Sequence, residues 1–419
     1  MPAVSWDFDV LIVGGGPAGS TCAAELRRRG VHAAIIDRAR FPRVKLCAGW
    51  ISDPIWDVLS LAPRQYPRGL WEWHRCHVYY DGRRYTVPAH GHFIRRYEFD
   101  DYLLQRAGVP VFEHHVRTIT RDGERWCIDD TFRAPYLVGA GGSQCPVARQ
   151  LFGNKTDAPV GVKERELATD AEAVAATRVG ADGEPELLLH RDLRGYSWNV
   201  PKGAWLNIGC GTVAAREVKP AWEAARHFLL EARHIPQSAA AQLEHMKGWS
   251  YHLFEPAHLE HSVREGAVLV GDALGLAQPL TAEGILPGTL SGAVAAASIA
   301  DGAVAHYPER LAAHPIIRDY KTLHAAKAGA ARVLPGQKQS ETHAAIGVAA
   351  SPERSSALAA AHYGMRQGLQ AATRWATARS FAWLFSGKPL PAGGLLASAM
   401  HLLARRRADE YPTHLPTRP

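Results

Sequence analysis

The chain has 419 residues, of which 47% are hydrophobic and 21% are charged, and its formal net charge is +7. This is an ordinary globular composition, and the length allows two or three domains with substantial cores. No apolar run reaches the roughly 18 residues that a membrane-spanning helix needs. The first residues lack the basic segment of a signal peptide, and the chain shows no nucleic-acid-binding motif and no internal repeat.

Six cysteines are scattered at positions 22, 47, 76, 127, 145 and 210. No pair has metal-ligand or C-x-x-C spacing, so we expect no metal site, free thiols and a reducing, cytoplasmic location. The positive charge is spread along the chain apart from Arg405-Arg406-Arg407. It is interpreted either as a contribution to solubility or as an attraction to anionic lipid.

The first forty residues predict a βαβ unit. Residues 8–13 (FDVLIV) form an apolar run typical of a strand that is buried on both faces of a parallel sheet. The run is followed by G-x-G-x-x-G at residues 14–19, a helical stretch that ends at Gly30, and a second strand over residues 33–36. Asp37 follows, 23 positions after Gly14, close to the roughly 20 expected for an acid that binds ribose hydroxyls.

Each part of this unit has a role in binding a dinucleotide. Gly14 permits the tight turn, Gly16 lets the backbone approach a pyrophosphate, and Gly19 lets the helix pack on the strand. The N-terminus of the helix offers unpaired N–H groups and the positive end of a dipole to the phosphates. We therefore predict a Rossmann-type dinucleotide-binding domain.

A second strand-and-acid motif lies far downstream, in Val268-Leu269-Val270-Gly271-Asp272-Ala273. A loop from Pro279 to Ile285 then leads into a helix that is rich in small residues. Here the chain resembles the flavoproteins with the para-hydroxybenzoate hydroxylase fold. The resemblance implies that Gly271-Asp272 binds the ribityl chain and pyrophosphate of FAD, and that the loop lies beside the flavin ring. A helix N-terminus at residues 284–288 would stabilise negative charge on a reduced flavin.

Two further segments fit the resemblance. Residues 94–100 (IRRYEFD) look like the R-x-x-F-D segment of these flavoproteins, whose arginine, Arg96 here, reaches FAD. Residues 139–142 (GAGG) stand where the group has G-A-D-G, so Gly141 replaces an aspartate that is tied to flavin and NAD(P)H binding. The departure leaves the cofactor unchanged but predicts slow reduction by NADPH or NADH.

We expect FAD to bind without covalent linkage. The residues expected to contact it come from all of the motifs above. They are Gly14, Gly16, Pro17, Ala18, Gly19, Asp37, Arg38, Arg43, Arg96, Gly271, Asp272, Pro279, Gly284 and Ile285. The electron donor is left open between NADPH, NADH and a reduced partner protein.

Two segments resemble the geranylgeranyl reductase family. Residues 41–49 (FPRVKLCAG) look like its F-P-R-x-K-x-C-G-G stretch, with Ala48 in place of the first glycine. Residues 196–202 (YSWNVPK), followed by Asn207-Ile208-Gly209-Cys210-Gly211, look like Y-x-W-x-F-P-K and N-V-G-x-G, with Val200 in place of Phe. The resemblance implies reduction of a carbon–carbon double bond by hydride transfer from flavin N5 to an apolar, isoprenoid-like or aromatic molecule.

Flavin-dependent halogenases are the rivals to this interpretation. Their W-x-W-x-I-P motif overlaps with Tyr196-x-Trp198-x-Val200-Pro201, whereas Cys47-Ala48-Gly49 and the Lys202–Gly211 extension favour a reductase. The alternatives are therefore a monooxygenase or halogenase that acts through a flavin hydroperoxide, and a non-catalytic flavoprotein or electron carrier.

Six residues are candidates for catalysis and substrate binding. Tyr196 and Trp198 alternate along a predicted strand, so both rings face the same side and suit a flat or apolar substrate, or else they pack in a core. Pro201 and Lys202 continue this substrate-binding set. Cys47 is interpreted as a proton donor or as a small packing residue, and Lys45 as a catalytic or a solvated side chain.

The predicted architecture is α/β, with an inserted antiparallel β substrate domain and a C-terminal helical region. The FAD domain is expected over residues 1–73, 93–160 and 250–325, and the substrate domain over 74–92 and 161–249. The substrate domain begins with a hairpin whose turn is Asp81-Gly82. Residues 326–419 are Ala-rich and predicted to be helical, either packing on the body or making a peripheral membrane contact.

Overall fold

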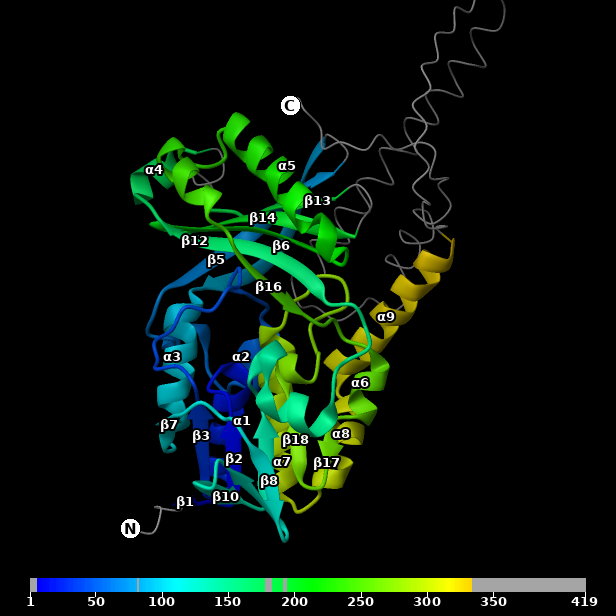
Figure 1. The fold of residues 1–419 in the computed structure, drawn as a ribbon. Helices are drawn as coiled ribbons and strands as arrows, with labels where there is room; N and C mark the ends of the chain where they lie inside the picture. The colour runs from blue at the N-terminus through cyan, green and yellow to red at the C-terminus, as the bar shows by residue number, and fades with distance from the viewer. Residues whose placement is uncertain (1–5, 81–82, 178–182, 191–193, 334–419) are drawn as a thin grey trace, which may run out of the picture.

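The computed structural model describes residues 6–80, 83–177, 183–190 and 194–333. Two sheets dominate the molecule (Figure 1), a six-stranded sheet flanked by helices and an eight-stranded sheet that lies across one end of it. The chain enters the eight-stranded sheet twice and returns to the six-stranded one each time. The fold is therefore α/β with an inserted β domain, as the sequence predicts.

The six-stranded sheet is parallel except at one edge. Its strands, in spatial order, are β17 (Val263–Arg264), β18 (Ala267–Leu269), β11 (Tyr136–Gly139), β2 (Val10–Val13), β3 (Ala33–Asp37) and β7 (Val111–Glu113). Only β17 pairs antiparallel, with β18. The side chains of β2 are almost completely buried, because helices cover both faces of such a sheet.

The predicted βαβ unit is confirmed, with one shift at its start. The strand β2 begins at Val10 rather than at Phe8, although Phe8 is also buried and donates its N–H to the carbonyl of Arg133. Helix α1 (Pro17–Arg28) follows the glycine turn, and the chain leaves it through Gly30, which has φ +75°. This left-handed conformation is the usual end of a helix at glycine.

Helix α7 (Ile285–Ala300) packs directly on α1. A Cβ atom at Gly292 would lie only 2.2 Å from the carbonyl oxygen of Ala18, so the two helices touch backbone to backbone. The small residues that marked this helix in the sequence therefore serve close helix contact. The other helices of this half are α2 (Pro54–Val58), α3 (Arg96–Ala107), α6 (Pro256–Glu260), α8 (Tyr307–Ala313) and α9 (Pro315–Val333).

A smaller sheet of four strands covers the end of the six-stranded sheet that is far from the eight-stranded sheet (Figure 1). Its strands are β1 (Trp6–Asp7), β10 (Phe132–Ala134), β9 (Arg125–Ile128) and β8 (Ile119–Asp122). Its buried side chains, among them Trp126 and Phe132, join the core of the six-stranded sheet.

The eight-stranded sheet is antiparallel except for the pair β13–β5. Its order is β16 (Lys247–Tyr251), β12 (Val160–Ala168), β15 (Trp205–Thr212), β14 (Gly195–Lys202), β13 (Glu186–Leu189), β5 (Leu70–Tyr80), β6 (Arg83–Ile94) and β4 (Trp50–Ile51). The predicted hairpin is present, since Tyr80 pairs with Arg83, and its two turn residues lie outside the described residues.

The two faces of this sheet carry separate cores. Helices α4 (Ala171–Ala175) and α5 (Val218–Glu231) lie on the outer face (Figure 1), where Trp222 of α5 packs with Leu206 and Ile208. The opposite face holds a second cluster, which includes Trp73 and Trp198. Residues that alternate along one strand thus enter different environments.

The strands allow the predicted domain limits to be placed on the fold. The second insertion begins with β12 at Val160 and ends with β16 at Tyr251, close to the predicted 161–249. The first insertion is wider than the predicted 74–92, because β4 and the start of β5 already belong to the eight-stranded sheet. The limits therefore remain a prediction whose first boundary falls inside a strand.

In the C-terminal region, α9 is the last element that the structure describes. The apolar segments and the arginine cluster on which the predicted membrane contact rests lie in residues 334–419, outside the described residues. Among the described helices, none combines the length and apolar character required to cross a membrane.

Candidate FAD and substrate site

The glycine turn between β2 and α1 leaves a side-chain-free surface. A Cβ atom at Gly14 or Gly19 would collide with backbone, at 2.4 Å from the Ala140 oxygen and 1.9 Å from the Gly14 oxygen respectively. A Cβ atom at Gly16 would instead point into open space, with only the Arg43 guanidinium within 4 Å. Gly14 and Gly19 are thus required by the packing of the protein itself, whereas Gly16 leaves room for a bound group.

Two carboxylates follow strands of the six-stranded sheet, β3 and β18, which lie on opposite sides of β2. Asp37 ends β3 and accepts hydrogen bonds from the N–H groups of Gly15, at 2.7 Å, and Ala39, at 2.9 Å. Asp272 follows β18 and lies against the N-terminus of α7, where a Cβ atom at Gly284 would be 3.0 Å from its Oδ1. The two acids that were predicted to bind FAD thus come from different parts of the chain, Asp37 beside the turn and Asp272 beside the start of α7.

Three charged side chains form a cluster beside the turn. The Arg96 guanidinium, on the first turn of α3, donates to both oxygens of Asp100 at 2.6 and 2.8 Å. Arg43 lies 3.3 Å from the same carboxylate and stacks over the Phe41 ring. Burial lowers the pKa of Arg96, but the Asp100 carboxylate outweighs it, and the pKa ends well above the usual value. For Arg43, burial lowers the pKa and the Asp100 carboxylate opposes that shift.

These residues fit FAD. The open surface at Gly16, the N-terminus of α1 and the neighbouring Arg43 suit a pyrophosphate. Of the remaining predicted contacts, Pro17 and Ala18 are buried in α1, Ile285 is buried at the start of α7, and Pro279 is buried in the loop before it. Arg38 is exposed. The individual FAD contacts remain predictions.

The segment around Cys47 is fixed from the eight-stranded sheet. Its N–H donates to Glu164 at 2.6 Å, and its carbonyl accepts from the Asn207 amide at 3.2 Å. The same amide donates to Glu164 at 2.9 Å, and the Asn207 oxygen accepts the indole N–H of Trp198 at 2.7 Å. Hydrogen bonds therefore connect Cys47 of the C-A-G segment to Asn207 and, through it, to Trp198.

Lys45 lies at the centre of this arrangement. Its ammonium stacks over the Trp249 ring at 4.5 Å and is in electrostatic range of Asp272, Cys47 and Glu164. Burial lowers its pKa, and these three groups oppose that shift. The structure thus places Lys45 in a half-buried position against Trp249, between the two domains.

Tyr196 and Trp198 share one face of β14, as their spacing predicts. Their rings are 5.9 Å apart, and the Tyr196 hydroxyl donates to the carbonyl of Thr281 at 2.5 Å. Thr281 belongs to the loop that the resemblance places beside the flavin ring. Trp198 is 7% exposed and belongs to the apolar cluster on this face. The pair therefore lies next to the predicted flavin loop, although Trp198 is also a core residue.

The last two predicted substrate residues are deeply buried. Lys202 has no exposed side-chain surface, and its ammonium forms an ion pair with Glu166 at 3.0 Å. Pro201 is buried in β14 opposite Leu206. Lys202 thus already has an anionic partner within the protein, and its predicted contact with substrate is untested.

A half-buried acid in the flavin loop, Glu283, was missed by the sequence analysis. Both Glu283 oxygens accept from the Ser52 hydroxyl, at 2.9 and 3.0 Å, and Oε1 also accepts from the Ser52 N–H at 3.2 Å. Burial raises the pKa of Glu283 to about 7, although Ser52 opposes the shift. The position of Glu283 inside the P-x-x-x-x-G-I loop could have indicated its role from the sequence. The roles of Glu164 and Asn207 become visible only in the folded chain.

Replacing Asp272 by alanine is expected to weaken FAD retention by at least tenfold, which corresponds to about 1.4 kcal/mol, because a hydrogen-bonding carboxylate is lost at the start of α7. FAD release followed by fluorescence during dilution measures the change. Asp122→Ala, at an exposed strand end, serves as the control. Equal retention by both variants would remove Asp272 from the site.

Comparison with known proteins supports FAD as the cofactor. A model of the FAD-binding domain matches residues 7–59. Digeranylgeranylglycerophospholipid reductase 1 of Methanothermobacter thermautotrophicus is 27% identical over 325 residues, which cover 71% of this chain and 79% of that protein.

Two solved structures share the fold. A geranylgeranyl bacteriochlorophyll reductase-like protein of Thermoplasma acidophilum matches with a TM-score of 0.57 and 19% identity, over 77% of this chain and 84% of that one. The flavin-dependent halogenase CmlS matches with a TM-score of 0.57 and 20% identity, over 78% of this chain and 65% of that one. Together with the motifs, these findings show an FAD-dependent oxidoreductase that is similar to the geranylgeranyl reductase-like flavoproteins and shares its fold with the flavin-dependent halogenases.

Proposed function

We propose that this oxidoreductase reduces a carbon–carbon double bond of an apolar, isoprenoid-like or aromatic small molecule. The observation that carries the proposal is the hydrogen-bonded chain from Cys47 through Asn207 to Trp198. It unites the two segments that resemble the reductase family, although about 150 residues separate them. The 27% identical relative named as a lipid reductase supports the same chemistry.

Bound FAD supplies the hydride, and the chain's own residues orient the substrate and deliver a proton. Tyr196 and Trp198 offer an aromatic face to an apolar substrate, and the Tyr196 hydroxyl, bound to Thr281, holds this face against the flavin loop. The apolar cluster around Trp198 excludes water from that side. These contacts would position a double bond without any charged recognition group.

Two groups are candidates for the proton that follows the hydride. The Cys47 backbone is held on both sides, by Glu164 and by Asn207, and this fixes where its thiol lies. Glu283 is a carboxylic acid whose pKa burial raises to about 7, so that part of it is protonated at neutral pH, and it lies on the loop beside the predicted flavin position. A general acid works best when its pKa lies near the working pH, which favours Glu283.

The titration of Glu283 gives a pH-dependent prediction. Its folded-state pKa of about 7 exceeds the ordinary value of 4.5, so the folded protein holds this proton more tightly than the unfolded chain. The stability that this provides is present below about pH 4.5 and is lost as the pH rises through 7. Between pH 5 and 8, the wild type should lose at most about 3 kcal/mol relative to Glu283→Gln.

Urea unfolding of both proteins at the two pH values measures this difference. Glu124→Gln, at an exposed turn position, is the matched control and should keep the wild-type profile. If wild type and Glu283→Gln show parallel pH dependence, Glu283 titrates as an ordinary carboxylate. The role of Glu283 as the proton donor would then be lost.

The electron donor is proposed to be NADPH, NADH or a reduced partner protein. Because Gly141 replaces the aspartate of the hydroxylases, both nicotinamides are expected to bleach the flavin slowly, over seconds or longer, in the absence of substrate. Anaerobic stopped-flow absorbance at the flavin band measures this rate. Bleaching within milliseconds would contradict the prediction and would favour direct reduction.

Oxygen-dependent chemistry is the second candidate function. The aromatic motif on β14 overlaps with the W-x-W-x-I-P motif of the halogenases, and CmlS has the same fold. The two functions differ in what the reduced protein requires. A monooxygenase or halogenase needs oxygen for turnover, whereas a reductase transfers its hydride without oxygen. A protein that turns over no substrate at all would instead fit an electron carrier.

The proposal is tested by anaerobic single turnover. Photoreduced protein is mixed with a geranylgeranyl-bearing lipid and with its fully saturated analogue as the control. The proposal predicts that only the unsaturated lipid reoxidises the flavin, and that mass spectrometry finds a gain of two hydrogens per reduced double bond. Reaction that occurs solely when oxygen is admitted would support the second candidate instead.

A further inference from the structure

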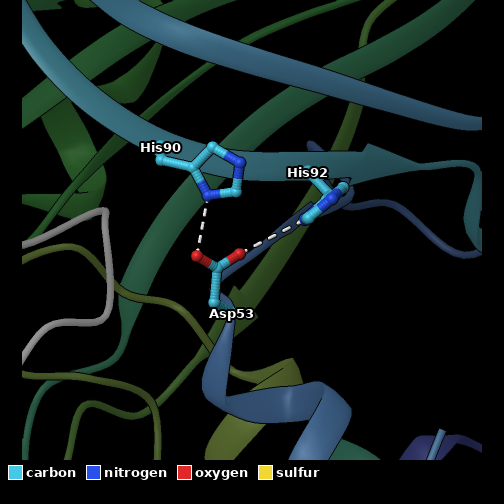
Figure 2. A group of neighbouring side chains, drawn as sticks. All are labelled: Asp53, His90 and His92. Atoms are coloured by element: carbon cyan, nitrogen blue, oxygen red, sulfur yellow. Dashed lines mark hydrogen bonds and ion pairs between the residues drawn. The ribbon is translucent and has the colours of Figure 1, made fainter. Parts of the chain in front are cut away.

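A cluster of metal-ligand side chains lies at the β4 edge of the eight-stranded sheet, apart from the residues assigned to FAD. Asp53 caps α2 immediately after β4, and His90 and His92 lie on β6. Glu72 lies opposite His92 on β5. Because residues two apart in a strand share a face, the two histidines point the same way. Figure 2 shows both imidazole rings directed at the Asp53 carboxylate.

Histidine nitrogens and carboxylate oxygens lie close together in this cluster. Nδ1 of His90 lies 2.7 Å from Asp53 Oδ2, and Nδ1 of His92 lies 3.3 Å from Asp53 Oδ1. The indole N–H of Trp56 donates to the same His92 nitrogen at 3.4 Å, so this nitrogen carries a lone pair. Asp53 Oδ1 is buried and accepts no hydrogen bond from any residue in the described ranges. A lone pair therefore faces a buried carboxylate oxygen that has no donor.

The other side of His90 is fixed as well. Its Nε2 lies 2.7 Å from Glu72 Oε1, a distance at which the ring N–H donates to the carboxylate. Nδ1 lies at the same distance from Asp53 Oδ2, so both ring nitrogens are placed to donate to carboxylates, and a metal would displace the proton on Nδ1. Histidines that bind metals usually donate their second nitrogen to a carboxylate in this way.

We propose that Asp53, His90 and His92 form a binding site for a divalent transition metal of the zinc class. The ligands are the Asp53 carboxylate and the Nδ1 atoms of the two histidines, and Glu72 orients His90. Two imidazoles and one carboxylate are a donor set that Zn²⁺ accepts, with a water molecule as the fourth ligand. Asp53 is 42% exposed, which gives water access to that position.

The three ligand atoms lie within 4.8 Å of one another, and the two Asp53 distances can be compared with tetrahedral coordination. Bonds of about 2.0–2.2 Å place two ligand atoms of a tetrahedral zinc roughly 3.3 Å apart. The pair Asp53–His92 already has this separation. The pair Asp53–His90, at 2.7 Å, would need to open by about 0.6 Å, and the long Trp56 bond to His92 would be given up.

A metal at this site would also stabilise the residue that contacts the flavin loop, Ser52. Asp53 directly follows Ser52, whose hydroxyl and N–H hold Glu283. A metal on Asp53 would therefore fix the backbone from which Ser52 donates. The expectation of no metal site considered only cysteine spacing, and it could not foresee a cluster from three separate segments.

Zinc retention by the FAD-loaded full chain tests the proposal. Protein treated with a chelator is incubated with Zn²⁺ alone, desalted, and its metal content is measured. We expect about one zinc per chain in the wild type and at least a tenfold loss in Asp53→Asn and in His92→Gln. His227→Gln, on the exposed surface of α5, is the matched control and should retain zinc. Failure of the wild type to retain zinc, or equal retention by all variants, overturns the proposal.

X-ray absorption at the zinc edge of the wild-type protein gives a second measurement that needs no variant. The proposal predicts only nitrogen and oxygen neighbours, with the outer-shell scattering of two imidazoles. Sulfur in the first shell would assign the metal to cysteines and overturn the proposal. FAD absorbance of every sample reports that the protein is folded, so loss of zinc is distinguished from loss of structure.

Discussion

Replacing Gly16 by alanine is expected to lower FAD affinity by at least a hundredfold, about 2.7 kcal/mol, in a protein that still folds. A Cβ atom at this position meets only the Arg43 guanidinium, at 3.6 Å, so the protein itself tolerates it. The same atom would occupy the surface where the backbone approaches the pyrophosphate. Titration of the apoprotein with FAD, followed by flavin fluorescence, measures the loss, and circular dichroism shows that the fold is intact.

Gly19→Ala is the contrasting variant. Its Cβ atom would lie 1.9 Å from the Gly14 carbonyl oxygen, so the first turn of α1 would have to move. We therefore expect this variant to lose both stability and FAD. If Gly16→Ala binds FAD like the wild type, the pyrophosphate does not lie over this turn, and the assignment of the glycine motif is wrong.

Truncating Trp198 to alanine is expected to cost about 3–5 kcal/mol of unfolding free energy, because a large side chain that is 7% exposed leaves an apolar cluster. Trp6→Ala, at a tryptophan that is 45% exposed, should cost much less and is the control. Urea unfolding measures both variants. A small loss for Trp198→Ala would mean that its ring does not support the core, contrary to the structure.

Trp198→Phe separates packing from the hydrogen-bonded chain. It keeps an aromatic ring but leaves Asn207 Oδ1 without its indole donor, which should cost about 1–3 kcal/mol. Because Asn207 also holds the Cys47 carbonyl, we expect slower hydride transfer with FAD still bound. Unchanged single-turnover rates in Trp198→Phe and in Cys47→Ser together would remove both residues from the proposed substrate site.

Local patterns in the sequence predicted the parts of the fold that local physics determines. The glycine turn, α1 and the acid at Asp37 follow each other within one βαβ unit, and the structure has them in that order. The alternation that placed Tyr196 and Trp198 on one face also needs only the geometry of a strand. The start of β2 was shifted by two residues because Phe8, although buried, pairs with the small sheet.

Contacts between distant segments were beyond such patterns. Glu164 and Asn207 hold Cys47 from strands more than 110 residues away, and no local motif marks that role. The half-buried position of Lys45 between the domains could not be distinguished from that of a solvated lysine for the same reason. The width of the first insertion was underestimated, because β4 has only two residues and its pairing with β6 leaves no periodic signal.

The most direct test of the proposed reductase chemistry is the reaction of the photoreduced, FAD-loaded protein with oxygen in a stopped-flow spectrophotometer. A reductase should return to the oxidised flavin spectrum without a transient absorbance band that differs from both the reduced and the oxidised forms. The halide or aromatic substrate of an oxygenase should not change this course. A transient band that lasts for seconds and decays faster when such a substrate is added would contradict the account and would establish oxygen-dependent chemistry in its place.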